Sequence, residues 1–211
     1  MEAVVFDMDG VIVDSERYWH RLEREIFEEE LEEDVEGVME EVKGRNYRET
    51  YELLAERYGL DMDRTEFIGR YDEAAEVIYG ERVELMEDFC ELVPDLREEG
   101  FKTAVVSSSP RRWIGMVFDR FGLEELFDLV LSVEEIEGGG KPQPDVYIHA
   151  AEKLGVEPGS CVAVEDSFNG VRSAKEAGMF CIRFGGEGEI ELADADALDA
   201  EDLRSKLKEF R

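Results

Sequence analysis

The sequence predicts an α/β fold in which a doubly wound parallel sheet forms the core and a small helical subdomain is inserted into it. Two observations support this prediction. Short, continuously apolar runs recur along the chain and alternate with helical patterns, as strands buried on both faces of a parallel sheet do. The long stretch between the first and second runs has many helix-forming residues and no such run, which indicates a separate helical unit.

The apolar runs cover residues 3–6, 103–106, 128–131, 161–164 and 179–182. The first four are each followed directly by an acidic residue or a serine. We therefore expect strands whose carboxyl ends carry polar side chains, at the edge where α/β sheets bind their ligands.

Helices are expected over residues 111–121, 145–154, 169–177 and 200–209. Two of them begin next to a proline, which the first turn of a helix tolerates. Strands that alternate with helices in this way favour right-handed crossovers and a parallel sheet.

Residues 15–85 interrupt that alternation. Apolar side chains such as Leu54 and Tyr58 recur there at helical spacing. We expect an α-helical cap subdomain over residues 15–85, and an α/β core domain made of residues 1–14 and 86–211.

The composition excludes several classes of protein. The 211 residues are 43% hydrophobic and 10% aromatic, enough for a core, so wholesale disorder is excluded. Asp and Glu number 55 against 24 Lys and Arg, a net charge of −31. Such a surface repels nucleic acid and anionic membranes, and we expect neither as a partner. Strong like charge also favours a monomer.

The charge imbalance has two interpretations. Lys occurs seven times and Glu 38 times, a pattern expected of a protein kept in solution at molar salt, where screening removes self-repulsion. The alternative is an acidic cytoplasmic protein without halophilic adaptation.

The three cysteines, Cys90, Cys161 and Cys181, are far apart and form no CxxC pair. This spacing indicates neither a disulfide framework nor a zinc site. The first residues carry acids instead of the basic segment of a signal peptide, and no apolar run approaches the ~18 residues of a membrane span. We expect a cytoplasmic protein.

Polar side chains follow the first, second and fourth apolar runs, and one lysine stands in a glycine-rich loop. If those strands are neighbours, their carboxyl ends bring these groups to one edge of the sheet. The candidate site then contains Asp7, Asp9, Gly10, Ser107, Ser108, Ser109, Lys141, Glu165 and Asp166.

Carboxylates that share a site repel one another unless a cation joins them. The donors are hard oxygens with no nearby Cys or His, which favours Mg²⁺ over zinc. Magnesium commonly bridges carboxylates and a phosphate, and the Ser107 hydroxyl and the Lys141 ammonium suit a phosphoryl group. We expect a small phosphorylated metabolite as the partner.

Four ordered motifs carry a family resemblance. Residues 7–11, DMDGV, resemble the DxDG(V/T) motif of the haloacid dehalogenase-like (HAD) phosphohydrolases, and Ser107 matches the second motif. Residues 140–145, GKPQPD, resemble the third motif, and residues 164–167, VEDS, with Gly170 resemble the fourth. The helical insert lies where the α-helical cap of phosphoglycolate phosphatase and β-phosphoglucomutase relatives belongs.

This resemblance implies a Rossmann-like core and a role for each motif residue. Asp7 is expected to attack phosphorus and form an aspartyl-phosphate, and Asp9 to act as general acid and base. Lys141 is expected to offset phosphoryl charge and keep Asp7 ionised. Mg²⁺ is expected to be held by Asp7, the Asp9 backbone carbonyl and Asp166, with Glu165 bound directly or through water.

The resemblance also implies substrate-binding positions. Relatives carry a substrate-specificity segment at the position of residues 43–46, and we expect it to face the active site. The alternative is a solvated helix start. The expected substrate-binding residues are Gly10, Ser108 and Ser109 of the core and Lys43, Gly44, Arg45 and Asn46 of the cap.

The expected function is a Mg²⁺-dependent phosphatase that hydrolyses phosphoglycolate or a sugar phosphate through an aspartyl-phosphate. A β-phosphoglucomutase-like phosphosugar mutase is one alternative. Those mutases place a His in the first cap helix and a Lys later in the cap. Here the His position holds Trp19, with His20 one place away, and the only Lys in the cap is Lys43.

A second alternative is a non-enzymatic phospho-receiver-type regulatory module. Receivers combine an acceptor Asp, an acidic cluster and a Lys, but they lack a helical insert after the first strand, and the second acid, Asp9, favours turnover over a lasting phosphoryl signal. Dehalogenase activity is a further branch, although Asp9 and the metal carboxylates belong to the phosphatase pattern.

Overall fold

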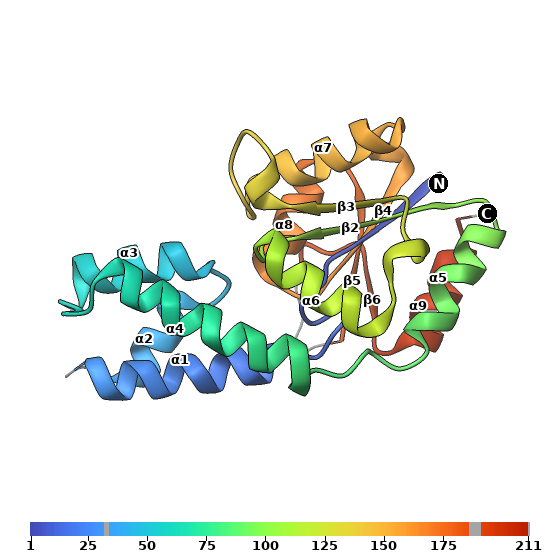
Figure 1. Cartoon of the computed structure of the whole chain (residues 1–211). Coiled ribbons are helices and arrows are strands. Elements are labelled where there is room, and N and C mark those ends of the chain that lie inside the picture. Colours follow the sequence, from blue (N-terminus) through green and yellow to red (C-terminus); the bar gives the residue numbers. More distant parts are fainter. Residues whose placement is uncertain (32–33, 186–190, 211) are drawn as a thin grey trace. The chain divides into compact units, whose positions relative to one another are not determined.

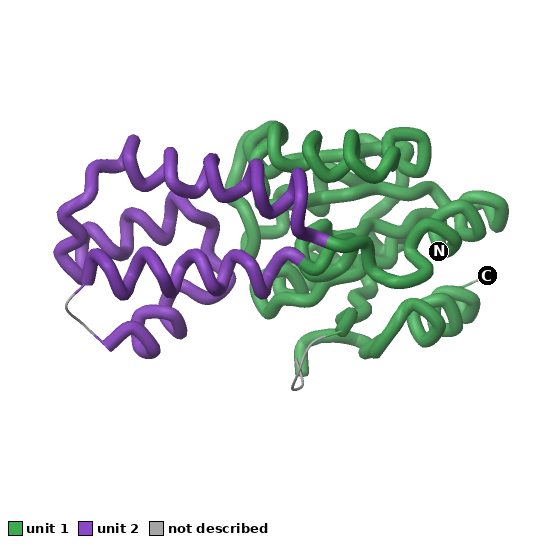
Figure 2. The backbone as a smooth tube through the Cα atoms, turned by 60° about the horizontal axis from the view of Figure 1, so that its bottom comes forward, with its two compact units in different colours: residues 1–14, 84–211 green, residues 15–83 purple. Residues whose placement is uncertain are grey.

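The computed structural model describes residues 1–31, 34–185 and 191–210, and the chain divides into two compact units (Figure 2). The first unit comprises residues 1–14 and 84–211, and the second comprises residues 15–83. The chain leaves and re-enters the first unit at one place, because the Asp14 amide donates to the Glu84 carbonyl at 3.2 Å and the Glu84 amide to Asp14 Oδ1 at 2.6 Å.

The core of the first unit is a six-stranded sheet of order β3-β2-β1-β4-β5-β6 in which all neighbours are parallel. This confirms the predicted fold class. The first strand lies at the centre, between the second and fourth strands of the chain, and the strand order reverses there. The strands are β1 (Ala3–Phe6), β2 (Lys102–Ser107), β3 (Leu129–Ser132), β4 (Cys161–Glu165), β5 (Phe180–Phe184) and β6 (Ala195–Ala197).

Helices cover both faces of this sheet (Figure 1). On one face, α7 (Asp145–Leu154) and α8 (Phe168–Glu176) pack on a cluster of buried side chains. The other face carries α5 (Phe89–Glu98), α6 (Arg111–Phe121) and α9 (Ala200–Lys208). Two covered faces explain why the strands are continuously apolar.

The alternation of β1 shows how the two layers share one strand. Val5 belongs to the cluster beneath the helices of the first face. Phe6 points the other way, where its ring lies edge-on to Phe89 at 5.4 Å and near Phe127 at 6.2 Å between ring centroids. Both side chains are fully buried, so β1 is anchored from both sides and its carboxyl end is held firmly.

Two elements of the first unit were not predicted. Strand β6 is a three-residue edge strand without an apolar run. Two acids hold it: Asp194, just before the strand, pairs with Lys175 at 2.6 Å, and Asp196, within the strand, pairs with Arg183. Helix α5 contains Pro94, which obscures its helical pattern. Short 3₁₀ turns complete this unit at Glu124–Leu126, Val133–Glu135 and Pro158–Ser160.

In the described part of the second unit, all regular secondary structure is helical. It has a core of large side chains, among them Phe27, Leu54 and Phe67, each fully buried. Its elements are α1 (Glu16–Glu30), α2 (Val35–Val42), α3 (Tyr47–Arg57), α4 (Arg64–Val77) and the π-helical turn η1 (Ile78–Arg82). Among the described residues of both units, no helix has the length and apolar character needed to span a bilayer.

Stacked aromatic rings and one half-buried carboxylate lie together in the second unit. Trp19 and Tyr47 both stack on Tyr71, with ring centroids 5.6 and 5.8 Å away, and the Tyr71 hydroxyl donates to Glu23 Oε1 at 3.1 Å. Burial raises the pKa of Glu23 from 4.5 to about 7, although the Tyr71 hydrogen bond lowers it. Glu23 is therefore ionised at a cost above neutral pH.

We predict that Glu23→Gln stabilises the protein in a pH-dependent way. Between pH 4.5 and 7 the folded state keeps a proton on Glu23 that the unfolded state loses, so stability falls as the pH rises. In urea melts the substitution should raise the free energy of unfolding by on the order of 1–3 kcal/mol at pH 8, and by almost nothing at pH 4.5.

The matched control is Glu25→Gln, an exposed position two residues along the same helix. It should change stability little at either pH. An equal gain from Glu23→Gln at both pH values would contradict this explanation, because a pH-independent gain cannot come from the cost of ionising Glu23.

Candidate active site

Asp7 follows β1 directly and lies where three strand ends meet. Phe6 pairs with Val105 of β2 and Val164 of β4, and the Asp7 amide extends the ladder by donating to the Val164 carbonyl at 2.9 Å. Because the strands are parallel and in register, Ser107 at the end of β2 and Glu165 at the end of β4 flank Asp7. The predicted convergence therefore depends on the central place of β1.

Lys141 joins two of these carboxylates. Its Nζ lies 2.5 Å from Asp7 Oδ1 and 2.5 Å from Glu165 Oε1, and all three side chains are buried. Hydrogen bonds fix the loop on both sides of Lys141. The Gly139 amide donates to Asp145 Oδ2 at 3.2 Å, and the Ser173 hydroxyl donates to the Gln143 carbonyl at 2.5 Å.

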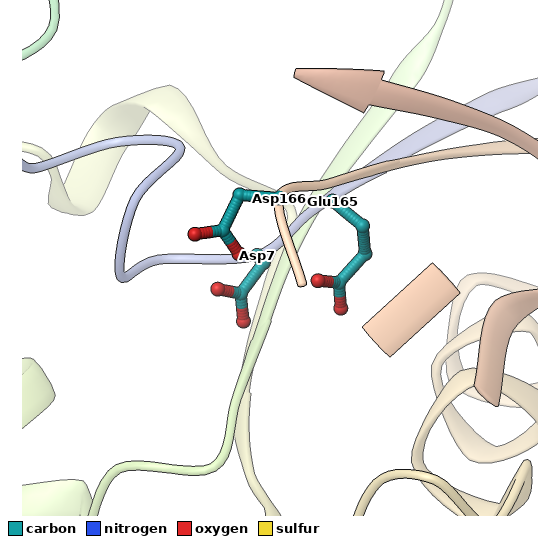
Figure 3. Close-up of side chains that lie close together, drawn as sticks. All are labelled: Asp7, Glu165 and Asp166. Atoms are coloured by element: carbon teal, nitrogen blue, oxygen red, sulfur yellow. The ribbon is translucent and has the colours of Figure 1, made fainter. Parts of the chain in front are cut away.

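Three carboxylates gather around this point (Figure 3). Asp7, Glu165 and Asp166 each offer an oxygen, and these oxygens lie within 4.8 Å of one another. Gly10 provides the room: its φ is +80°, and a Cβ atom there would stand 1.9 Å from Asp166 Oδ2. A side chain at this position would meet both backbone strain and a collision with the cluster.

Burial and neighbouring charges shift the pKa values of Asp7 and Lys141. Burial raises the pKa of Asp7 to about 8, with help from the Glu165 and Asp9 carboxylates and against the opposing effect of Lys141. Burial lowers the pKa of Lys141, but Asp7 and Glu165 outweigh it and leave the ammonium fully charged. Three converging carboxylates repel one another, and their oxygens fit a hard divalent cation held by oxygen ligands.

Asp9 makes different contacts. Ser109 Oγ donates to Asp9 Oδ2 at 2.8 Å, and Ser107 Oγ lies 3.5 Å from the same oxygen. Ser132, at the end of β3, donates its hydroxyl to the Ser109 carbonyl at 2.8 Å and so orients this segment. The Asp9 side chain thus contacts Ser107 and Ser109. The sequence predicts metal binding through the Asp9 backbone carbonyl, and this stays a prediction.

Ser107 and its neighbours form a tight turn beside Asp7. Ser107 is fully buried, and its hydroxyl accepts from the Ser109 amide at 3.0 Å. Ser108 between them is half-buried. This turn leads through Pro110 into α6, whose N-terminal end favours an anion.

The predicted substrate-binding residues of the insert lie in the second unit. Lys43, Gly44 and Arg45 are exposed, and Arg45 Nε donates to the Glu41 carbonyl at 3.0 Å. Asn46 is the N-cap of α3, where its side chain accepts from the Arg48 and Glu49 amides at 3.0 and 3.1 Å. The structure therefore shows a helix start at this segment, and its contact with substrate stays a prediction.

Sequence reasoning missed two polar contacts of the site. Tyr147 donates its hydroxyl to Glu165 Oε1 at 2.5 Å, and Ser132 holds Ser109. Tyr147 matches the apolar positions of its helix, so the pattern hides its hydroxyl. The available signal is that the hydroxyl of a buried tyrosine usually has a hydrogen-bond partner.

We predict that Gly10→Ala destabilises the protein more than backbone strain alone explains. The matched control is Gly122→Ala, since Gly122 has a φ of +66° but a Cβ atom there would meet nothing within 4 Å. The control should cost about 1 kcal/mol, and Gly10→Ala about 2–4 kcal/mol, because it also displaces Asp166. Equal losses in urea melts would contradict the predicted collision.

Comparisons with known proteins agree with this geometry. The family model of haloacid dehalogenase-like hydrolases matches residues 1–178. Hexitol phosphatase B of Escherichia coli K12 is 32% identical over 84% of this chain and 80% of its own, and the Beta-phosphoglucomutase of Bacillus subtilis is 27% identical over 98% and 93%.

A solved structure extends the likeness to the whole fold. CbbY from Rhodobacter sphaeroides, in complex with phosphate, superposes with a TM-score of 0.79 at 25% identity and covers 94% of each chain. With the ordered motifs and the acidic cluster, these matches show that the chain belongs to the haloacid dehalogenase-like hydrolases.

Proposed function

We propose that this protein is a Mg²⁺-dependent phosphatase that hydrolyses a small phosphate monoester through an aspartyl-phosphate on Asp7. The observation that carries the proposal is the buried Asp7 carboxylate, which pairs with Lys141 and lies within an acidic cluster at the end of the central strand. A nucleophile, a fixed ammonium and a cation-binding set at one point are what phosphoryl transfer requires.

In this proposal the first step transfers the phosphoryl group to the enzyme. An Asp7 carboxylate oxygen forms a bond to phosphorus as the bond to the ester oxygen breaks. Asp9, in its protonated form, gives a proton to the departing alcohol oxygen. The hydrogen bond from Ser109 to Asp9 orients that carboxyl.

The second step returns the enzyme to its starting state. Asp9, now ionised, takes a proton from water, whose oxygen forms a bond to phosphorus while the bond to Asp7 breaks. Inorganic phosphate leaves, and Asp9 is protonated again. The two carboxyl groups, both of which follow β1, thus act in turn.

The surrounding residues bind and neutralise the phosphoryl oxygens. Lys141 favours the ionised form of Asp7 against the effect of burial, which raises the Asp7 pKa, and the Ser107 hydroxyl with the amides that follow it would donate hydrogen bonds to the phosphoryl oxygens. Asp7, Asp166 and the Asp9 carbonyl would hold Mg²⁺, with Glu165 direct or through water. When bound, Mg²⁺ would supply positive charge that offsets the charge of the transferring group.

We propose a phosphorylated carbohydrate as the substrate, in preference to phosphoglycolate. The relatives named above carry hexitol and glucose in their names, although neither name establishes the substrate of this chain. Recognition of the leaving group would fall to the helical insert, with Lys43, Gly44, Arg45 and Asn46 as the proposed contacts.

A phosphosugar mutase is the second candidate, because a named mutase aligns with nearly the whole chain. The residues of the insert disfavour it. Trp19 holds the position of the mutase His, and its indole N–H donates to Tyr79 Oη at 3.0 Å, while His20 is exposed. An indole cannot exchange a proton with a sugar hydroxyl as an imidazole does.

We predict Mg²⁺-dependent release of phosphate from hexitol and hexose phosphates, measured against phosphoglycolate and p-nitrophenyl phosphate. Asp7→Asn should lower kcat at least ~10³-fold, because an amide is a far weaker nucleophile. Asp9→Asn should lower kcat about 10²–10⁴-fold by removing the general acid. Asp61→Asn, an exposed position in the second unit, is the control and should retain full activity.

EDTA should abolish the activity, and excess Mg²⁺ should restore it. A folded, Mg²⁺-loaded protein that releases no phosphate from any of these esters would exclude the phosphatase. Conversion of β-glucose 1-phosphate to glucose 6-phosphate without phosphate release would establish the mutase instead.

We also propose that the acidic surface is adapted to high salt. The net charge of −31 is far beyond the ~2–8 common for small domains, so self-repulsion destabilises the folded state at low ionic strength. Raising KCl from about 0.1 to about 2 M should raise the Tm by about 5 °C if screening contributes about 2 kcal/mol. Sucrose of equal osmolality is the control; a Tm independent of KCl would refute the adaptation.

A further inference from the structure

The Glu165 carboxylate is a charge enclosed within the core unit. Its side chain is fully buried at the end of β4. Oε1 accepts from Tyr147 Oη at 2.5 Å and lies 2.5 Å from Lys141 Nζ, while Oε2 lies 3.5 Å from Ser167 Oγ. Three separate segments therefore place donors around one carboxylate, as a buried charge requires.

Gly170 lies directly against the Glu165 carboxylate. A Cβ atom on Gly170 would stand 1.9 Å from Glu165 Oε2 and 2.3 Å from Oε1. The backbone of α8 therefore passes so close to the carboxylate that only glycine leaves room. Gly170 has an ordinary backbone conformation within the helix, so its lack of a side chain serves the carboxylate and not the backbone.

Tyr147 reaches the same group from α7. Its side chain is fully buried among the apolar residues that join α7 and α8 to the sheet. The Lys141 ammonium lies 5.4 Å from the centre of its ring, close enough for a favourable cation–π contact. One side chain thus touches both the carboxylate and the ammonium of the Asp7–Lys141–Glu165 network.

We propose that Tyr147 is a positioning residue that holds Glu165 in place, keeps Lys141 shared between Glu165 and Asp7, and thereby sets the affinity of the acidic cluster for a divalent cation. The cation part of this inference rests on the proposed function. Hydrogen bonds that orient the ligands of a metal commonly contribute a factor of about 10 to 100 to metal affinity.

Lys141 divides its contacts between two carboxylates, and the phenol of Tyr147 sustains that division. With the phenol present, Oε1 has two donors, and Nζ can lie equally close to Asp7 and to Glu165, at 2.5 Å from each. Without the phenol, Oε1 would depend on Nζ alone, and the carboxylate would be free to rotate toward the ammonium. Lys141 would then move away from Asp7, and the three carboxylates would no longer converge.

The experiment compares the Mg²⁺ dissociation constants of EDTA-stripped wild type and Tyr147→Phe by titration calorimetry. We expect the Kd to rise about 10-fold in the variant. Tyr51→Phe is the matched control, because its hydroxyl donates to a backbone carbonyl, that of Met62 at 3.2 Å, within the second unit. The control should leave the Kd within about twofold of wild type.

A merely structural role for Tyr147 would lower the Tm without changing the Kd for Mg²⁺, and that result would overturn the proposal. A double-mutant cycle with Glu165→Gln sharpens the test. If Tyr147 acts through Glu165, its substitution should change the Kd less than about twofold in the Glu165→Gln background. A full effect of about 10-fold there would show that Tyr147 acts by another route.

Gly170→Ala provides a second variant should Tyr147→Phe fail to fold. Its added Cβ atom would collide with the same carboxylate, so the substitution should also raise the Kd about 10-fold. An unchanged Kd in folded Gly170→Ala would overturn the proposed placement of Glu165. The experiment distinguishes failure of the cation site from failure of the proposed role of Tyr147. Wild type that binds no Mg²⁺ overturns the cation site. Wild type that binds Mg²⁺ only as tightly as Tyr147→Phe overturns only the role of Tyr147.

Discussion

The contact of one ammonium with two carboxylates governs the active end of this protein. Lys141 Nζ is shared between Asp7 and Glu165, and none of the three groups could stay buried alone without a large loss of solvation. The surrounding structure serves this arrangement: a hydrogen-bonded loop delivers the lysine, two adjacent strands deliver the carboxylates, and a phenol and a glycine enclose Glu165. Catalysis of the proposed kind would use the same charges.

The order of the strands makes this arrangement possible. Because β1 lies between β2 and β4, the serines of one neighbour and the acids of the other reach Asp7 from opposite sides. Residues far apart in the sequence then share a few ångströms of space. The apolar layers on both faces of β1, such as those around Val5 and Phe6, keep its end from shifting when charge accumulates there.

The two units carry different sets of residues. Every group proposed to touch phosphorus or Mg²⁺ belongs to the first unit, which also carries the family motifs. The second unit has its own core and a half-buried acid, Glu23, whose pKa desolvation raises. Under the proposed function, the first unit would carry the reaction and the insert would contact the leaving group.

The fold class could be predicted from the residues alone, because continuous apolar runs and helical periodicity follow from burial on two faces, and the family followed from four ordered motifs. The polar residues after β1, β2 and β4 could be identified in the same way. The sequence did not indicate β6, which has no apolar run, or α5, where a proline interrupts the pattern. Asn46 stands in the expected specificity segment, but the motif did not indicate that its side chain caps α3. Only the tertiary structure revealed that Tyr147 contacts Glu165, that Ser132 contacts Ser109 and that Gly170 leaves room for Glu165. The hydrogen-bond partners are distant in the sequence, and burial alone does not identify the partner of a polar group.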